Sequence, residues 1–166
     1  MVRILTLISI LITISCSEKN SEEITERFDN GNKKLLVKYK GDNGEEVILE
    51  KMEFFKEGDT LIWENYNING KREGKWISYY ENGQIKKEGN YMNGWYYGSW
   101  NSYYENGQIE SKENFSNQKR EGKWISYYEN GQIKTEGNYK YGKRKDKWTS
   151  YDENGMKIKE RIFNVE

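Results

Sequence analysis

Residues Gly74–Tyr91 read GKWISYYENGQIKKEGNY, and this stretch decides the fold because it returns three more times. The copies are GSWNSYYENGQIESKENF from Gly98, GKWISYYENGQIKTEGNY from Gly122 and DKWTSYDENGMKIKERIF from Asp146. The tryptophans and the turn glycines recur every 24 residues, as Trp76, Trp100, Trp124 and Trp148, and as Gly83, Gly107, Gly131 and Gly155. A fixed period of this length indicates a repeat architecture in which each unit packs on its neighbours.

Each copy predicts one β-hairpin, because Asn-Gly between two strand-like runs favours a two-residue type I′ turn. With Asn82-Gly83 as the loop, Tyr80 would pair with Ile85, and Trp76 would pair with Gly89. We therefore expect an all-β protein, built of serial antiparallel β-hairpins that form an elongated, single-layer, twisted sheet.

The pairing of Trp76 with Gly89 predicts a structural role for the tryptophans. A glycine inside a strand is costly unless a large ring covers it. Trp76 over Gly89 and Trp124 over Gly137 fit that arrangement. Because side chains alternate between the two faces of a strand, we expect Ile85 on the tryptophan face and Lys86 on the opposite face.

The first 15 residues have the character of a secretory signal peptide, with Arg3 followed by an apolar run. The only cysteine, Cys16, follows directly, and the run Thr13-Ile14-Ser15-Cys16 resembles the lipobox of bacterial lipoproteins. The resemblance implies cleavage before Cys16, lipid attachment to its sulfur, and a membrane-anchored protein of the cell envelope, at the outer membrane or cell surface in preference to the inner membrane. Residues 16–26 would then be the lipidated cysteine and a flexible tether.

The repeat domain is expected to span residues 27–163. Residues 27–73 are degenerate units, in which Phe28-Asp-Asn-Gly31 matches the turn of the later copies, and residues 74–163 are four regular units. Atypical terminal units are common in repeat proteins because they cap the stack.

Composition excludes several classes of function. The 27 basic and 27 acidic residues balance, so no overall field attracts nucleic acid. The chain has no histidine and none of the common catalytic or nucleotide-binding motifs. The repeated carboxylates lie beside turns, where no single acid–base pair stands out. We expect no enzymatic activity, no cofactor and no metal site.

Two features between the hairpins are candidate binding residues. Three connections carry a basic pair, Lys71-Arg72, Lys119-Arg120 and Lys143-Arg144, which stacked along one edge would form a positive ladder. An ordinary solvated turn, neutralised by the neighbouring Glu73, Glu121 and Asp146, is the simpler explanation of such pairs. The remaining connection carries Trp95-Tyr96-Tyr97, an aromatic cluster that either packs between hairpins or forms a binding patch.

The recurring Gly-x-Trp, Tyr-Tyr-x-Asn-Gly and Tyr-x-x-Gly patterns resemble the MORN-repeat variant proteins of bacteria, which are often grouped as YwqK-type antitoxins. The resemblance implies an elongated sheet of hairpins that binds partners or membranes and performs no catalysis. The hairpins are also similar to choline-binding repeats, in which neighbouring rings cage a ligand, although only Trp95-Tyr96-Tyr97 has their adjacent aromatic residues.

Three functions remain open from the sequence. The chain would be a membrane-anchored scaffold for a protein partner, an envelope module that binds glycan or anionic lipid, or the antitoxin of a toxin–antitoxin pair. Lipidation at Cys16 separates the first two functions from the third, because a toxin in the cytosol is out of reach of an exported protein.

Overall fold

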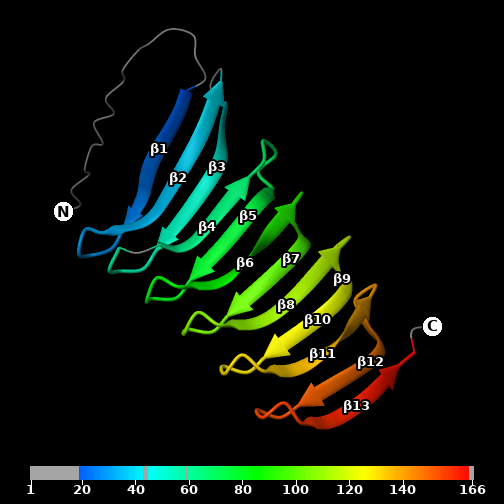
Figure 1. Cartoon of the computed structure of the whole chain (residues 1–166). Coiled ribbons are helices and arrows are strands. Elements are labelled where there is room, and N and C mark those ends of the chain that lie inside the picture. The colour runs from blue at the N-terminus through cyan, green and yellow to red at the C-terminus, as the bar shows by residue number, and fades with distance from the viewer. Residues whose placement is uncertain (1–18, 43–44, 59, 165–166) are drawn as a thin grey trace, which may run out of the picture.

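A computed structural model describes residues 19–42, 45–58 and 60–164. These residues form one antiparallel sheet of 13 strands, whose spatial order follows the chain except that the short β9 pairs with β8 outside this order (Figure 1). The strands are β1 (Lys19–Arg27), β2 (Lys33–Asp42), β3 (Glu45–Phe54), β4 (Thr60–Tyr66), β5 (Arg72–Tyr79), β6 (Ile85–Met92), β7 (Trp95–Tyr103), β8 (Ile109–Ser116), β9 (Lys119–Arg120), β10 (Gly122–Tyr127), β11 (Ile133–Lys140), β12 (Lys143–Tyr151) and β13 (Lys157–Phe163).

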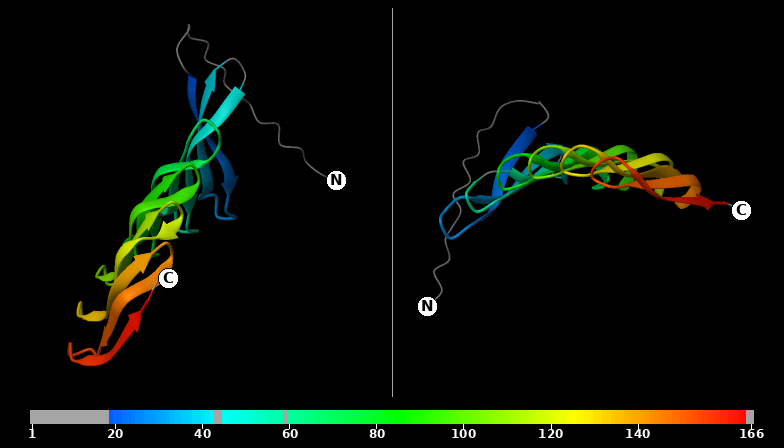
Figure 2. Two further views of the ribbon diagram at one scale, coloured as in Figure 1. Left: turned by 90° about the vertical axis from the view of Figure 1, so that its right-hand side faces the viewer. Right: turned by 60° about the horizontal axis from the view of Figure 1, so that its bottom comes forward.

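The sheet is a single curved layer, with β1 at one edge and β13 at the other (Figure 2). The expected all-β, single-layer fold of serial hairpins is confirmed. Since no second layer formed by the described residues covers the sheet, rings and neighbouring strands supply most of the burial. The buried apolar side chains among the described residues are Leu36, Val37, Ile77, Tyr91, Trp100 and Trp148.

The segment expected to be a tether is a strand from Lys19 onward. β1 pairs antiparallel with β2 from Lys19 opposite Gly41 to Arg27 opposite Lys33. The sheet therefore already includes Lys19–Arg27, and the prediction that it begins only at Arg27 is wrong. The polar run lacks an apolar alternation that would have predicted a strand, because β1 is an edge strand whose pairing rests on backbone hydrogen bonds. Cys16 and the expected signal peptide lie outside the described residues.

The Asn-Gly turn differs from the expected two-residue turn. Tyr80 N donates to Gln84 O at 2.8 Å, and Gly83 N donates to Tyr80 O at 3.0 Å, so the loop has three residues, Glu81 to Gly83. Gly83 has a φ of 81°, and Asn82 does not share the positive φ that a type I′ turn requires at both central residues. This geometry is that of a three-residue loop ending in a glycine bulge.

A second irregularity restores the expected register further from the turn. Tyr79 pairs with Ile85, whereas Ser78 pairs with Lys87, so Lys86 is the extra residue of a β-bulge. The predicted pair of Trp76 with Gly89 is therefore correct, and the predicted pair of Tyr80 with Ile85 is wrong. The bulge also exchanges the faces predicted for Ile85 and Lys86. Lys86 Nζ lies 5.3 Å from the ring centroid of Tyr80 on the tryptophan face, and Ile85 lies opposite Tyr79 on the other face.

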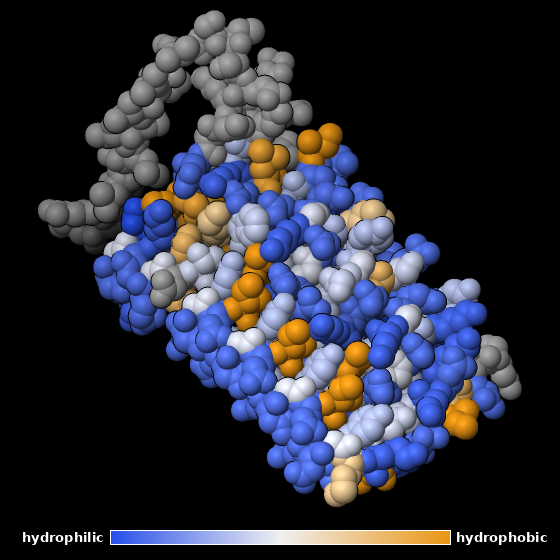
Figure 3. Space-filling view, viewed as in Figure 1, coloured by the Kyte–Doolittle hydropathy of each residue, from blue (hydrophilic) through white to orange (hydrophobic). Residues whose placement is uncertain are grey.

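We call the two sides the tryptophan face and the isoleucine face. The tryptophan face carries the repeat tryptophans Trp76, Trp100, Trp124 and Trp148. The isoleucine face carries the strand isoleucines of the same units, Ile77, Ile85, Ile109, Ile125 and Ile133. A row of apolar side chains runs along the sheet among polar residues in the space-filling view (Figure 3).

The ring that covers each strand glycine comes from the next hairpin, and the prediction of cover within one hairpin is wrong. A Cβ built on Gly89 would lie 2.1 Å from Cδ2 of Trp100, and one built on Gly137 would lie 2.2 Å from Cδ2 of Trp148. Trp100 Nε1 then donates to Asn90 O at 3.1 Å, and Trp148 Nε1 does the same to Asn138 O. Each glycine therefore joins one hairpin to the following one.

The tyrosine before each Asn-Gly turn joins the units at the turn edge. Tyr80 Oη donates to Tyr103 O at 2.7 Å, Tyr104 Oη to Tyr127 O at 2.6 Å, and Tyr128 Oη to Tyr151 O at 2.8 Å. The last unit has Asp152 at this position, where no further hairpin follows in the described chain, and Asp152 instead accepts hydrogen bonds from Asn154 N and Met156 N within its own turn.

Tyr104→Phe is expected to lower the free energy of unfolding by about 1 kcal/mol, because it removes one hydrogen bond between neighbouring units. Urea denaturation followed by tryptophan fluorescence measures the change. Tyr141→Phe is the matched control, since Tyr141 is 66% exposed on a turn. Equal stability of wild type and Tyr104→Phe would show that the hydroxyl does not join the units.

Candidate functional site

All the residues expected in loops between the hairpins except Lys71 instead lie in strands, because three of the four connections are two-residue turns. Asn93-Gly94, Asn117-Gln118 and Tyr141-Gly142 all have positive φ at both residues, which is the signature of type I′ turns. Arg72 opens β5, Lys119-Arg120 form β9, Lys143 opens β12 and Trp95 opens β7. The candidate binding residues other than Lys71 are therefore held in register with the sheet.

Along this edge, arginines and aromatic rings stack on one another in a ladder on the tryptophan face. Arg72 lies 5.3 Å from the centroid of Tyr91, which lies 5.2 Å from the ring of Tyr96. Tyr96 stacks on Phe115 at 5.0 Å, and Arg120 lies 5.6 Å from the rings of both Phe115 and Tyr139. Cation–π contacts of this kind contribute about 0.5–1 kcal/mol each at exposed sites.

Two of the three arginines of the basic pairs also neutralise buried carboxylates. Arg72 Nη2 lies 3.0 Å from Glu64 Oε1, and Arg120 Nε lies 2.7 Å from Glu113 Oε2. Glu64 and Glu113 are 5% and 7% exposed. Because each of these arginines is paired with a carboxylate, the positive charge of the ladder predicted from the sequence is lower at Arg72 and Arg120. The lysines Lys71, Lys119 and Lys143 are exposed.

Glu64 is the most densely bonded carboxylate of the site. Its oxygens accept hydrogen bonds from Tyr66 Oη at 2.5 Å and from Trp76 Nε1 at 2.9 Å. Burial alone would raise the pKa of Glu64, but these two hydrogen bonds and the charge of Arg72 outweigh burial and leave the pKa below its usual value. Burial and the hydrogen bond to Glu64 raise the pKa of Tyr66 to about 12.

The aromatic cluster Trp95-Tyr96-Tyr97 is divided between the two faces. Tyr96 packs edge-on against Trp100 at 4.4 Å and belongs to the ladder. Trp95 pairs with Met92 and Tyr97 pairs with Asn90, which places both on the isoleucine face. There Met92, Trp95 and Tyr97 are 45%, 55% and 48% exposed. We call these three residues the Trp95 patch.

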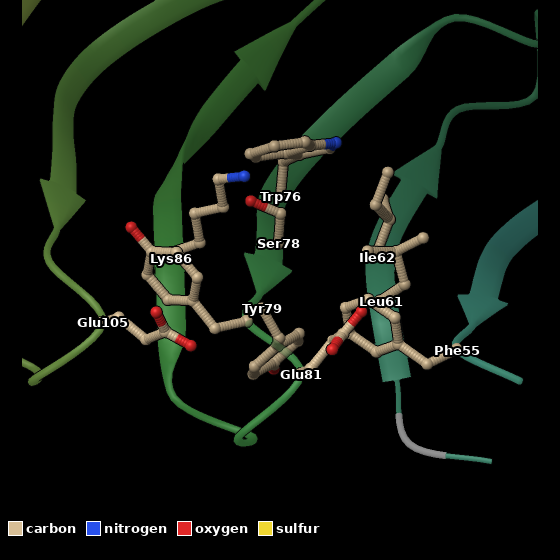
Figure 4. Close-up of a pocket in the computed structure, with 10 residues that line it drawn as sticks. Phe55, Leu61, Ile62, Trp76, Ser78, Tyr79, Glu81, Lys86 and Glu105 are labelled. Atoms are coloured by element: carbon tan, nitrogen blue, oxygen red, sulfur yellow. The ribbon is translucent and has the colours of Figure 1, made fainter. Parts of the chain in front are cut away.

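The sequence did not predict a hollow of about 450 Å³ beside the turn edge of β4, β5 and β6 (Figure 4). Trp76 and Ser78 from β5 face Ile62 of β4 across the hollow, with Phe55, Leu61, Tyr79, Tyr80 and the charged Glu81, Lys86 and Glu105 around them. Position 52, one period before Trp76, is methionine where the later units carry tryptophan. Within the described residues, Trp76 contacts the ring of Trp100 at 5.5 Å.

The described residues hold no group of three or more Cys, Asp or Glu placed to share a metal ion. Across the same ranges, no helix is long and apolar enough to cross a membrane. Buried side-chain nitrogen and oxygen atoms of the described chain all have a hydrogen-bond partner. The buried polar groups of the described residues thus all form hydrogen bonds within the protein, and we look for a ligand site on the exposed surfaces.

Comparison with known proteins gives one family. The MORN repeat variant matches three consecutive segments, residues 72–93, 96–117 and 120–141. No curated protein matches the chain. Each matched segment contains one strand pair joined by an Asn-Gly turn, namely β5–β6, β7–β8 and β10–β11. Three consecutive segments of the open antiparallel sheet thus match the MORN repeat variant.

Proposed function

We propose that this protein is a membrane-anchored, non-catalytic scaffold that binds a protein partner through the Trp95 patch. The observation that carries the proposal is the exposure of Met92, Trp95 and Tyr97 together on one face, whereas Trp100 and Trp148 are buried. Trp, Tyr and Met are enriched in protein interfaces, and Trp and Tyr dominate their binding energy. MORN repeats suggest a binding module in general, and we take the Trp95 patch as its binding surface.

The repeat tryptophans do not compete for this role. Trp100 and Trp148 are 1% and 4% exposed, and both lie on strand glycines. Trp76 and Trp124 contact them at 5.5 and 5.4 Å, so the four rings form two pairs. A partner would reach Trp95 and Tyr97 without disturbing these contacts.

Trp95→Ser/Tyr97→Ser is expected to reduce recovery of the partner about tenfold or more, because truncation of central interface rings typically costs about 2 kcal/mol. The test captures the tagged full chain from the membranes of the cell that makes it and compares wild type with the double variant. Ile68→Ser/Tyr141→Ser is the matched control, because these side chains are 74% and 66% exposed outside the patch. Equal recovery with both double variants would contradict the proposal.

The anchor is tested on the same preparation. Mass spectrometry of the intact protein is expected to show a chain that begins at acylated Cys16, and Cys16→Ser is expected to release the protein from the membrane. An unmodified Cys16 that still follows residues 1–15 would remove the anchor and favour the antitoxin alternative.

The alternative of an envelope module for glycan or anionic lipid rests on the exposed Lys71, Lys119 and Lys143. Sedimentation with purified cell wall or anionic vesicles decides it. Binding that is lost with all three lysines and survives loss of Trp95 and Tyr97 would replace the protein partner as the ligand.

A further inference from the structure

The repeats alternate in pairs, and the last hairpin breaks the alternation. The strand residues that pair with a repeat tryptophan alternate between glutamate and glycine along the sheet. They are Glu64 and Gly89, which both pair with Trp76, Glu113, which pairs with Trp100, and Gly137, which pairs with Trp124. The ladder position 24 residues apart holds Arg72, Tyr96, Arg120 and Arg144. Glutamate accompanies arginine in two units, and glycine accompanies tyrosine in one. In the last unit, however, glycine accompanies Arg144.

Arg144 consequently has no carboxylate beneath it. Its Cζ lies 4.3 Å from the ring centroid of Trp148 and 5.7 Å from that of Phe163. No ion pair within 4.0 Å joins Arg144 to an acidic group in the described part of the chain, whereas Arg72 and Arg120 each have one at 3.0 and 2.7 Å. The guanidinium is fixed on an aromatic support with its charge unbalanced.

Two further cations lie on the same face of the edge strand β13. Arg161 pairs with Trp148, and Lys159 pairs with Ser150. Neither makes an ion pair among the described residues. Together with Arg144, they line a hollow of about 170 Å³, whose remaining walls are Trp148, Ser150, Thr135 and Phe163. The hydroxyls of Ser150 and Thr135 lie 3.2 Å apart and supply two further hydrogen-bonding groups.

The two acidic residues on strands β12 and β13, Asp146 and Glu160, form ion pairs with lysines that do not line the hollow. Asp146 pairs with Phe163 in the ladder, and its Oδ2 lies 3.7 Å from Lys145 Nζ. Glu160 pairs with Thr149 on the isoleucine face and contacts Lys157 at 3.1 Å and Lys147 at 3.8 Å. The hollow therefore has three cations, two hydroxyls and no carboxylate among its lining residues.

We propose that this hollow on the last hairpin is a binding site for an oxyanion of the phosphate class. Two planar guanidiniums present paired N–H donors to tetrahedral oxyanions, and an ammonium adds a point charge. A phosphate dianion balances more of the three positive charges than a single carboxylate does. The size of the hollow suits one such group, carried on a small molecule or free. This site lies apart from the Trp95 patch and does not depend on it.

Inorganic phosphate added to the ¹⁵N-labelled full chain is expected to shift the Trp148 indole N–H and the Ser150 amide resonances saturably, with a midpoint of about 1 mM. Arg161→Gln is expected to raise that midpoint about tenfold, because one bidentate charged contact is lost. Arg161 and Lys159 are exposed on an edge strand, so Lys159→Gln provides a second variant that keeps the fold and weakens binding.

Lys143→Gln is the matched control, since it removes the same charge from an exposed side chain that does not line the hollow. Its midpoint is expected to equal that of wild type. Acetate at matched ionic strength is expected to shift the same resonances far less. The site is overturned by an absence of saturable shifts, by an equal loss in Lys143→Gln, or by an equal response to acetate.

Discussion

Gly89→Ala is expected to lower the free energy of unfolding by about 3 kcal/mol, a large effect for the addition of one methyl group. The new Cβ would lie 2.1–2.6 Å from three atoms of the Trp100 indole, which is 1% exposed. Trp100 cannot move away easily, because its Nε1 bonds to Asn90 O and its ring contacts Trp76, Tyr91 and Tyr96. Urea denaturation of wild type and variant measures the change.

Gly83→Ala adds the same methyl group where nothing lies within 4 Å of the new Cβ. Its cost comes from the positive φ of 81°, and we expect about 1 kcal/mol. The difference between the two variants isolates the steric contact from the general cost of replacing glycine. Equal losses at Gly83 and Gly89 would contradict the covering role of Trp100.

Arg72→Met is expected to destabilise the sheet by about 2 kcal/mol, because it leaves the carboxylate of Glu64 buried without its cation. Urea denaturation at neutral pH measures the loss. Lys71→Met is the matched control, since Lys71 is the exposed neighbour in the same basic pair. Equal effects of the two substitutions would mean that the ion pair of Arg72 with Glu64 contributes nothing.

The same carboxylate gives a pH dependence with a defined sign. The hydrogen bonds to Glu64 and the charge of Arg72 outweigh burial and lower its pKa, so its contribution to stability is present above the unfolded-state pKa and is lost as the pH falls through the folded value. Burial and Glu64 raise the pKa of Tyr66 to about 12, so the contribution of its phenol is lost only as the pH rises through that value. Arg72→Met is expected to shift the acid transition to higher pH.

The sequence predicts each hairpin and the register of its outer part, because Asn-Gly and the 24-residue period are local signals. The pair of Trp76 with Gly89 is correct for this reason. The type of turn is not predictable from Asn82-Gly83 alone, because the same dipeptide suits a type I′ turn and a three-residue loop that needs positive φ only at glycine. The bulge at Lys86 compensates for the longer loop, so the two local differences cancel further along the strands.

Contacts between hairpins are harder to predict, because the pattern of one unit does not name its neighbour. Trp76 is the direct cross-strand partner of Gly89, and only the three-dimensional sheet shows that Trp100 of the following strand lies on this glycine. The division of Trp95 and Tyr97 from Tyr96 likewise follows from the tight turn at Asn93-Gly94, which the sequence did not separate from a longer loop. That Arg144 lacks a carboxylate is recognised only when the units are compared, because Gly137 then stands where Glu113 pairs with Arg120.

The central claim is that the tryptophan of one hairpin covers the glycine of the preceding hairpin and so holds neighbouring repeats together. Nuclear Overhauser effects from the Gly89 Hα protons test it most directly. We predict strong effects to the indole protons of Trp100 and an upfield ring-current shift of the Gly89 resonances that disappears in Trp100→Leu. Effects to Trp76 with none to Trp100, and a Gly89 shift unchanged by Trp100→Leu, would contradict the account.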